Sequence, residues 1–327
     1  MEKTDTRPPF AASGGVIPPE FRKIKTPCYV LDETALIKNA ELMGKIAEKT
    51  GCKMLLAQKA FSNYDCYHLL EPYLAGTEAS GLYEARLGAQ EMPGKEVHVF
   101  CAGYREDEFE ELLCFADHIV FNSPSQLLRF GKRAKQAGKS VGLRINPECS
   151  TQEGHAIYDP CAPGSRMGTT RAQWEAAVKM HPDLTGLLDG IHFHTLCEQD
   201  SSDLETTLAA VKVKFGDLIS QVKWLNLGGG HHITRPGYDI ARLEKCIEAA
   251  KEEWKVDIYL EPGEAWALNA GFFLTTVLDV LQNGDTRLAI LDGSAACHMP
   301  DVLEMPYRPP LLGAGEPGEH AVTVRLG

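Results

Sequence analysis

The sequence predicts an α/β protein: a (β/α)8 TIM barrel followed by a smaller, C-terminal β-rich domain. Eight short β-like segments alternate with helix-like segments, and eight is the strand number of such a barrel. Polar residues recur where these segments end, which is where barrels build active sites. After Glu261 the alternation gives way to strands without long helices between them. A doubly wound open sheet is the alternative, and it requires no fixed number of strands.

The eight predicted strands are short apolar segments. They span residues 53–59, 75–80, 97–103, 118–122, 141–147, 188–195, 224–230 and 257–263. Two long segments, 33–50 and 201–222, repeat apolar residues every three or four positions, which is the spacing of one buried helix face. Ser123 and Pro124 supply a helix N-cap followed by proline at the first helical position.

The pattern divides the chain into three predicted regions. Residues 1–25 are expected to form a flexible N-terminal arm. Residues 26–265 are expected to form the barrel, with 26–33 pairing with the β domain. Residues 266–327 are expected to form that C-terminal β domain, with strands at 272–280, 287–291 and 321–326. Because the last strand runs to the end of the sequence, we expect this domain to be incomplete.

Composition and charge limit the classes of function. The 327 residues are 44% hydrophobic and 24% charged, as in soluble globular proteins. No apolar run approaches the roughly 18 residues that cross a bilayer, and no secretory signal is visible. The net charge of −12 argues against nucleic acid and anionic membranes as partners. The ten cysteines contain no C-x-x-C pair, which favours free thiols in a reducing cytoplasm.

An apolar segment, residues 54–57, leads through Gln58 to Lys59 at the end of the first predicted strand. A lysine there either extends its ammonium group to solvent or loses its charge, as a neutral amine or in a covalent bond. Lysine forms an imine with an aldehyde only as the neutral amine, and an apolar approach lowers the free-energy cost of that form. Lys59 is therefore a candidate nucleophile.

Two further strand ends carry candidate binding groups. Gly228, Gly229 and Gly230 let backbone N–H groups approach an anion such as phosphate, although a simple tight turn is an equally good interpretation. Glu261 ends an apolar strand and needs a cationic partner. That partner is either Arg144 or a protonated ring nitrogen.

Five histidines raise the alternative of a zinc site. They are His192, His194, His231, His232 and His298. None has a strong metal-ligand spacing such as H-E-x-x-H, so we predict no metal. An imine-forming lysine, a phosphate-binding loop, a flat histidine and a carboxylate for a pyridinium nitrogen together indicate pyridoxal 5'-phosphate (PLP).

The motifs resemble those of PLP-dependent decarboxylases with the alanine-racemase-like fold, which act on ornithine and diaminopimelate. TPCYVLDE (26–33), LAQKAFS (56–62), the A-S-x-x-x-E segment (79–84) and EPGE (261–264) carry this resemblance. Longer motifs resemble the carboxynorspermidine/carboxyspermidine decarboxylases of polyamine synthesis: DPCAPGSRMG, GIHFHTLCEQ, NLGGGHHITRPGYD and GSAACHMPDVLEMPY. The resemblance covers nearly the whole chain from Thr26 onward.

The resemblance implies a role for each site residue. The catalytic residues would be Lys59, His194 and Glu261. The residues that contact PLP would be Lys59, Ser80, Arg144, His194, Cys197, Gly228, Gly229, Gly230, Glu261 and Gly263. The residues that contact the substrate would be Glu264, His298 and Asp301. Acidic groups at Glu264 and Asp301 would suit the cationic tail of a carboxylated polyamine. The resemblance also implies a homodimer with shared active sites, completed by family residues beyond the position of Gly327.

The implied reaction is decarboxylation of carboxynorspermidine or carboxyspermidine to norspermidine or spermidine and CO2. Alternatives are a decarboxylase of diaminopimelate or another basic amino acid, a racemase, and an inactive PLP-binding regulatory homologue. A diaminopimelate enzyme would normally carry an arginine for the distal carboxylate, and Glu264 argues against it. The preference between the two polyamine substrates stays open.

Overall fold

The computed structural model describes residues 18–152, 159–304, 306–316 and 318–327. Contacts within the chain divide it into two units: Glu33–Leu268, and the described residues up to Asp32 together with Asn269–Gly327. The second border lies close to the predicted one at 265, and the first falls within residues 26–33, the segment predicted to pair with the β domain. Most of the predicted N-terminal arm lies outside the described residues, and its remainder includes a short 3-10 helix, η1 (Pro19–Lys23).

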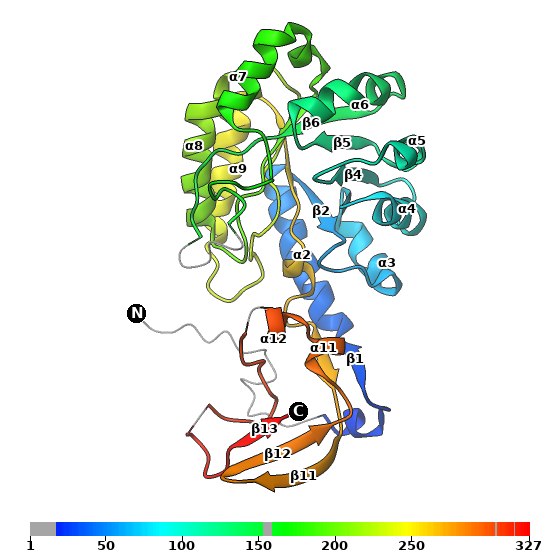
Figure 1. Cartoon of the computed structure of the whole chain (residues 1–327), viewed down its shortest axis with the longest axis vertical. Helices are drawn as coiled ribbons and strands as arrows, with labels where there is room; N and C mark the ends of the chain where they lie inside the picture. Colours follow the sequence, from blue (N-terminus) through cyan, green and yellow to red (C-terminus); the bar gives the residue numbers. More distant parts are fainter. Residues whose placement is uncertain (1–17, 153–158, 305, 317) are drawn as a thin grey trace. The chain divides into compact units, whose positions relative to one another are not determined.

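The first unit is a closed barrel of eight parallel strands in sequential order (Figure 1). The strands are β2 (Lys53–Ala57), β3 (Gly76–Ala79), β4 (Glu96–Phe100), β5 (His118–Phe121), β6 (Ser140–Arg144), β7 (Gly190–His192), β8 (Trp224–Asn226) and β9 (Asp257–Leu260). Each overlaps one of the eight predicted segments, which confirms the (β/α)8 barrel. Most predicted strands ran on too far, because the residues that follow each strand belong to the loops at the C-terminal end of the barrel.

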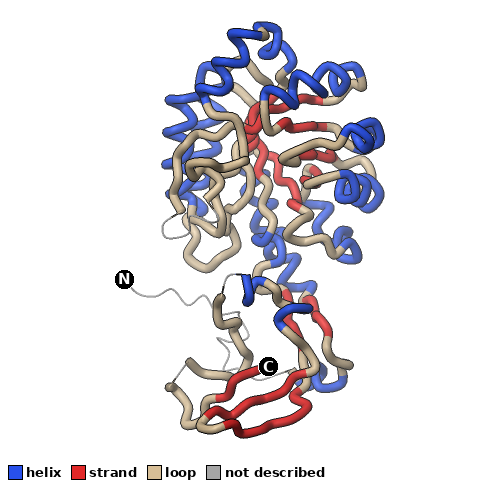
Figure 2. The backbone as a smooth tube through the Cα atoms, in the orientation of Figure 1, coloured by secondary structure: helices blue, strands red, loops and turns tan. Residues whose placement is uncertain are grey.

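Helices surround the barrel, as the tube in Figure 2 shows. They are α2 (Glu33–Thr50), α3 (Tyr67–Leu70), α4 (Leu82–Glu91), α5 (Glu106–Phe115), α6 (Pro124–Gln136), α7 (Arg171–Met180), α8 (Ser201–Ile219), α9 (Ile240–Trp254) and α10 (Glu264–Ala267), with 3-10 turns η2 (Tyr64–Cys66), η3 (Glu71–Tyr73) and η5 (Pro182–Leu187). Helix α2 buries Leu36, Ala40 and Met43, the face that its periodicity predicts. Ser123 caps α6 by accepting from the Gln126 N–H, as predicted. Among the described residues, no helix combines the length and apolar character needed to cross a membrane.

The middle of the barrel is filled by side chains from several strands. Leu55, Val120, Trp224 and Tyr259 form a buried cluster there. A Cβ on Gly190 would lie 1.9 Å from the Trp224 ring, and one on Gly142 would lie 2.4 Å from it. The indole of Trp224 therefore fills the space where any other residue at position 142 or 190, on two neighbouring strands, would place its side chain. This packed layer separates the two ends of the barrel.

The second unit contains two small sheets. Strand β1 (Cys28–Leu31) pairs antiparallel with β10 (Gly271–Leu274). Strand β11 (Val277–Asn283) pairs antiparallel with β12 (Thr286–Leu291), which pairs in parallel with β13 (Val324–Leu326). Two short helices, α11 (Ala295–His298) and α12 (Asp301–Glu304), follow β12.

The single strand predicted at 272–280 is wrong, because this segment forms two strands in different sheets. The break falls at Thr275 and Thr276. Asp292 accepts hydrogen bonds from the Thr275 hydroxyl (2.6 Å) and the Thr276 N–H (2.9 Å). Because the Thr276 N–H is directed to a carboxylate, the chain leaves the first sheet at this point. This is a tertiary contact, and the alternation of apolar residues in the sequence does not reveal it.

Candidate active site at the C-terminal end of the barrel

Glu261 lies just after β9 and is buried, with 4% of its surface exposed. Asn226 Nδ2 donates to its Oε1 (2.7 Å), and His192 Nε2 lies 3.0 Å from its Oε2. Because a carboxylate only accepts hydrogen bonds, the His192 proton lies on Nε2. Burial acts to raise the pKa of Glu261, but His192, with smaller contributions from His98 and Lys59, lowers it to about 2. Glu261 is therefore an ionised carboxylate held in place by two donors.

His194 follows β7, and a hydrogen bond from a neighbouring loop fixes its ring. Its Nδ1 accepts from the Gly229 N–H (3.2 Å), so the ring proton lies on Nε2. Burial, followed by the charges of Lys59 and Arg144, holds the pKa of His194 well below its ordinary value. His194 is accordingly a neutral, oriented imidazole at neutral pH.

Lys59 lies in the turn after β2 and is exposed. The predicted apolar approach is buried, but it ends before the lysine, so the expected apolar surroundings of the amine are not found. Its positive charge contributes to the low pKa values of His194 and Glu261 and opposes the rise in the pKa of Glu78. The structure thus brings the amine into the electrostatic range of three groups from three other strand ends.

Arg144 ends β6 and is 6% exposed. Its Nη2 donates to the His194 carbonyl (3.1 Å), and its guanidinium lies 4.5 Å from the centre of the Phe100 ring. Burial lowers the pKa of Arg144 to about 10, so the group remains charged at neutral pH. No ion pair joins Arg144 to Glu261 among the described residues, which leaves both charges available to a ligand.

The three glycines allow close packing of loops more than an open anion cradle. A Cβ on Gly229 would lie 2.5 Å from the Glu261 carbonyl oxygen, and one on Gly230 would lie 2.0 Å from that of Leu196. The Gly228 N–H donates to Asn226 Oδ1 (2.9 Å), and the Gly229 N–H is used by His194. The N–H of the third glycine, Gly230, donates to no protein group within the described part of the chain.

The remaining predicted residues of the barrel unit border this group. The Ser80 N–H donates to the Glu84 carboxylate at the start of α4. Cys197 is exposed, and a Cβ on Gly263 would lie 2.6 Å from the Ala60 Cβ. Glu264 is the first residue of α10, and its Oε1 lies 3.5 Å from His232 Nε2. The close approach of Gly263 to Ala60 places the loop after β9 against the segment that carries Lys59, and the contact of Glu264 with His232 joins it to the glycine loop.

Comparison with known proteins gives the family. No protein-family model matches the chain. The carboxynorspermidine/carboxyspermidine decarboxylase of Campylobacter jejuni is 40% identical over 294 residues, which span 90% of this chain and 74% of that protein. The carboxyaminopropylagmatine decarboxylase of Synechocystis is 39% identical over 310 residues, spanning 94% and 78%. The crystal structure of Campylobacter jejuni carboxynorspermidine decarboxylase with norspermidine matches at a TM-score of 0.79 and 39% identity, covering 87% and 72%.

The chain belongs to the carboxynorspermidine/carboxyspermidine decarboxylase family. It is therefore a carboxy-lyase of polyamine biosynthesis, and it has the barrel-plus-β-domain fold of these decarboxylases. The resemblance inferred from the motifs is confirmed by this result. Among the predicted substrate contacts of this decarboxylase, Glu264 lies in the barrel unit, whereas His298 and Asp301 lie in the second unit. There His298 stacks on Phe273 with ring centres 4.8 Å apart, and Asp301 is exposed.

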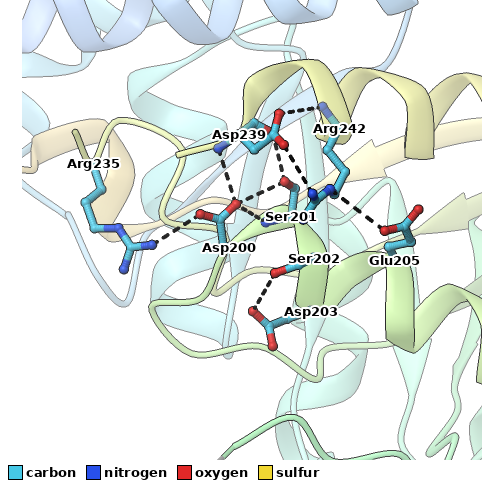
Figure 3. Close-up of polar contacts among 8 residues, drawn as sticks. All are labelled: Asp200, Ser201, Ser202, Asp203, Glu205, Arg235, Asp239 and Arg242. Carbon is cyan, nitrogen blue, oxygen red and sulfur yellow. Dashed lines mark hydrogen bonds and ion pairs between the residues drawn. The ribbon is translucent and has the colours of Figure 1, made fainter. Parts of the chain in front are cut away.

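Two loops of the decarboxylase site are joined by a polar network around Asp200, the N-cap of α8 (Figure 3). Its Oδ1 accepts from the Ser201 N–H (2.6 Å) and from the N–H of Asp239, the N-cap of α9 (3.2 Å). Its Oδ2 lies 3.4 Å from Arg235 Nη2. The backbone joins the same loops, since the Gln199 N–H donates to the Gly230 carbonyl (3.0 Å). Asp200 thus ties the loop of His194 to the glycine loop.

Three groups of this site had no predicted catalytic or binding role, although His192 was considered as a zinc ligand. Asn226 holds both Glu261 and Gly228, His192 is bound directly to Glu261, and Glu78 is 4% exposed at the end of β3. Burial, followed by the negative charge of Glu261, raises the pKa of Glu78 to about 8. The sequence nevertheless contained a signal. Glu78, His192 and Asn226 each precede a predicted site residue by two positions, and alternate residues of a strand point to the same face of the sheet.

The five histidines considered as zinc ligands do not meet as a group of three ligand atoms within the described residues. The group that does, Glu96, His98 and His118, involves different residues.

Proposed function

We propose that this decarboxylase uses PLP to convert carboxynorspermidine or carboxyspermidine into norspermidine or spermidine and CO2. The observation that carries the proposal is the convergence of the Lys59 amine, the neutral His194 and the ionised Glu261 at one end of the barrel. The reaction needs a site that holds a cationic ring beside a primary amine, and this donor set fits PLP.

The residues present match each part of the cofactor. Lys59 has a primary amine for the aldehyde, Glu261 is an acceptor for a protonated pyridine nitrogen, and the flat His194 ring suits one face of the ring. For the phosphate, the chain offers the free N–H of Gly230 and the charged guanidinium of Arg144. When bound, PLP supplies an aldehyde and an electron-withdrawing ring that accepts the electron pair left by the departing carboxylate.

The chain's own groups control protons around that chemistry. Glu261 stays ionised and holds a proton on the ring nitrogen, which Asn226 and His192 support by fixing both carboxylate oxygens. His194 adds no positive charge, because its pKa lies far below neutrality. Glu78, with a pKa of about 8, is protonated at neutral pH and lies within the electrostatic range of the Lys59 amine.

The substrate tail is cationic, and Glu264 is the exposed carboxylate of the barrel unit that we assign to it. His298 and Asp301 are the proposed contacts from the second unit. A second substrate class is favoured by one observation: the Synechocystis carboxyaminopropylagmatine decarboxylase is nearly as similar as the first relative. We retain the homodimer as part of the proposal, and we assign the protein to the cytoplasm, where its ten free cysteines stay reduced.

The first experiment incubates the purified protein with PLP, reduces it with borohydride and maps the pyridoxyl adduct by peptide mass spectrometry. An adduct on Lys59 that is absent from Lys59→Ala, and present in the exposed control Lys179→Ala, supports the cofactor site. An adduct confined to other lysines would contradict it. CO2 release from carboxynorspermidine, carboxyspermidine and carboxyaminopropylagmatine then ranks the substrates, and sedimentation velocity tests the homodimer.

A further inference from the structure

A second cluster of ionisable side chains lies at the opposite end of the barrel. Glu96 and His98 come from β4 and His118 begins β5, near the N-terminal ends of these strands. Ligand atoms of the three side chains all lie within 4.8 Å of one another. None of the three is among the residues assigned to the site around Lys59, and their rings pack against Trp224 and Tyr259, with His118 5.3 Å from the Trp224 ring and His98 4.7 Å from the Tyr259 ring.

One carboxylate oxygen faces both imidazoles. Glu96 Oε2 lies 2.9 Å from His98 Nε2 and 3.8 Å from His118 Nε2. The two rings stack, with centres 3.9 Å apart and planes 11° apart. Two imidazoles and a carboxylate form a mixed nitrogen–oxygen donor set, which suits borderline cations better than Mg²⁺ or Ca²⁺.

Both imidazoles keep a nitrogen that no protein group occupies. The Nδ1 atoms of His98 and His118 are both buried and have no hydrogen-bond partner among the described residues. A buried polar atom without a partner is costly, and a bound ion would change the bonding of this pair.

The carboxylate is oriented by Lys53 through one oxygen, so that the other, Oε2, faces the two imidazoles. Lys53 Nζ donates to Oε1 (3.0 Å) and to the Tyr259 hydroxyl (2.7 Å). The Glu96 side chain is 32% exposed, which gives an ion a route from solvent. The same lysine opposes a cation by its charge, so its removal should strengthen binding.

We propose that Glu96, His98 and His118 bind one divalent transition-metal ion at the N-terminal end of the barrel strands, with Zn²⁺ the best match to the donors. The ion would join β4 to β5 and stabilise the folded barrel, because it binds only where these strands are paired. The N-terminal face of such barrels serves stability, and no role in decarboxylation is assigned to the ion.

The test titrates the untagged holoenzyme with Co²⁺, which replaces Zn²⁺ and absorbs in the visible range when it is bound. We expect saturation at one Co²⁺ per chain, displacement by Zn²⁺, and no near-ultraviolet thiolate band. The thiolate band identifies cysteine binding instead, which matters because Cys114, Cys197 and Cys297 are exposed. Zn²⁺ should also raise the melting temperature by several degrees.

Three variants separate the site from a hydrogen-bonded cluster without metal. His118→Ala should lose the Co²⁺ band and the Zn²⁺ shift in melting temperature, whereas the matched surface variant His181→Ala should keep both. Lys53→Met should bind Co²⁺ roughly tenfold more tightly, since it removes one nearby positive charge. Absence of saturable binding by the wild-type protein overturns the proposal, and so does binding that His118→Ala leaves unchanged. If His118→Ala fails to fold, unchanged or weaker binding by Lys53→Met overturns it.

Discussion

The two ends of the barrel each hold a glutamate beside a histidine, and their surroundings give them opposite uses. Glu261 receives hydrogen bonds from His192 and Asn226, which is uncharged, and its side chain is 5% exposed. Glu96 pairs with the Lys53 ammonium and is 32% exposed. Both carboxylates contact a buried imidazole, but the second oxygen of Glu261 meets a neutral amide whereas that of Glu96 meets an ammonium. Glu261 therefore keeps its full charge for a cofactor, whereas the charge of Glu96 is partly neutralised and serves the stability of the fold, alone or with a bound ion. The partners decide the role more than burial does.

The largest effect should follow from removing the amine at the C-terminal end. Lys59→Ala should reduce decarboxylation by more than about a thousandfold, because the proposed imine chemistry depends on this amine. The free energy of unfolding should change little, since Lys59 is exposed. CO2 release and denaturant unfolding measure the two. Lys179→Ala serves as the control, and near-normal turnover by Lys59→Ala would refute the proposed role.

The second largest effect should follow from neutralising Glu261, the carboxylate that faces the cofactor. Glu261→Gln keeps the shape but loses the negative charge, and kcat should fall by about 10²–10³, as when one preorganised electrostatic partner is removed. The matched change at the other end, Glu96→Gln, should leave kcat within about twofold. Steady-state kinetics on both variants checks this contrast, and equal losses of kcat would abolish the distinction between the two ends.

Glu78 predicts a pH dependence of stability. Its pKa is raised from 4.5 to about 8, so its contribution is fully present below pH 4.5 and is lost as the pH rises through 8. Between pH 5 and pH 8 the PLP-free wild type should lose about 3 kcal/mol of stability through this group. Glu78→Gln should not show this loss. Denaturant titrations at the two pH values measure it, and parallel curves for the two proteins would argue against a buried, protonated Glu78.

At the N-terminal end the expected effect is smaller. Although burial acts to raise the pKa of Glu96, hydrogen bonds from His98 and Lys53 lower it. Its stabilising contribution is therefore present above the ordinary carboxyl pKa and is lost as the pH falls. Glu96→Gln should cost about 1–2 kcal/mol at pH 7, after allowance for its partial exposure. Thermal and denaturant unfolding test this, and a stability equal to wild type would show that Lys53 and Glu96 contribute nothing to the fold.

The smallest effect concerns the loops at the C-terminal end. Asp200→Asn keeps a side-chain oxygen for the Ser201 and Asp239 N–H groups but loses the ion pair with Arg235. PLP affinity should weaken about three- to tenfold, with kcat at saturating PLP nearly unchanged. Fluorescence titration of the PLP-free protein measures the affinity. Asp203→Asn, on the same helix turn, is the control and should bind PLP as the wild type does.

Much of this arrangement could be predicted from sequence, because it depends on local patterns. The barrel follows from eight buried segments, and Lys59 and Glu261 each stand directly after one of them. The contacts of Asn226 and His192 with Glu261 could not be predicted, since they depend on the register among β7, β8 and β9. The pairing of His98 with His118 across β4 and β5 is of the same kind. The exposure of Lys59 was missed because β2 ends two residues before it.

The fit of Trp224 against Gly142 and Gly190 has a consequence for how this protein can evolve. The indole also donates to the Ser140 hydroxyl (2.9 Å), so its orientation is fixed from a third point on the barrel wall. A side chain at either glycine would need a smaller residue at position 224, and a smaller residue there would leave a void that favours larger ones at 142 and 190. In diverging descendants of this sequence, these three positions should therefore change together or not at all.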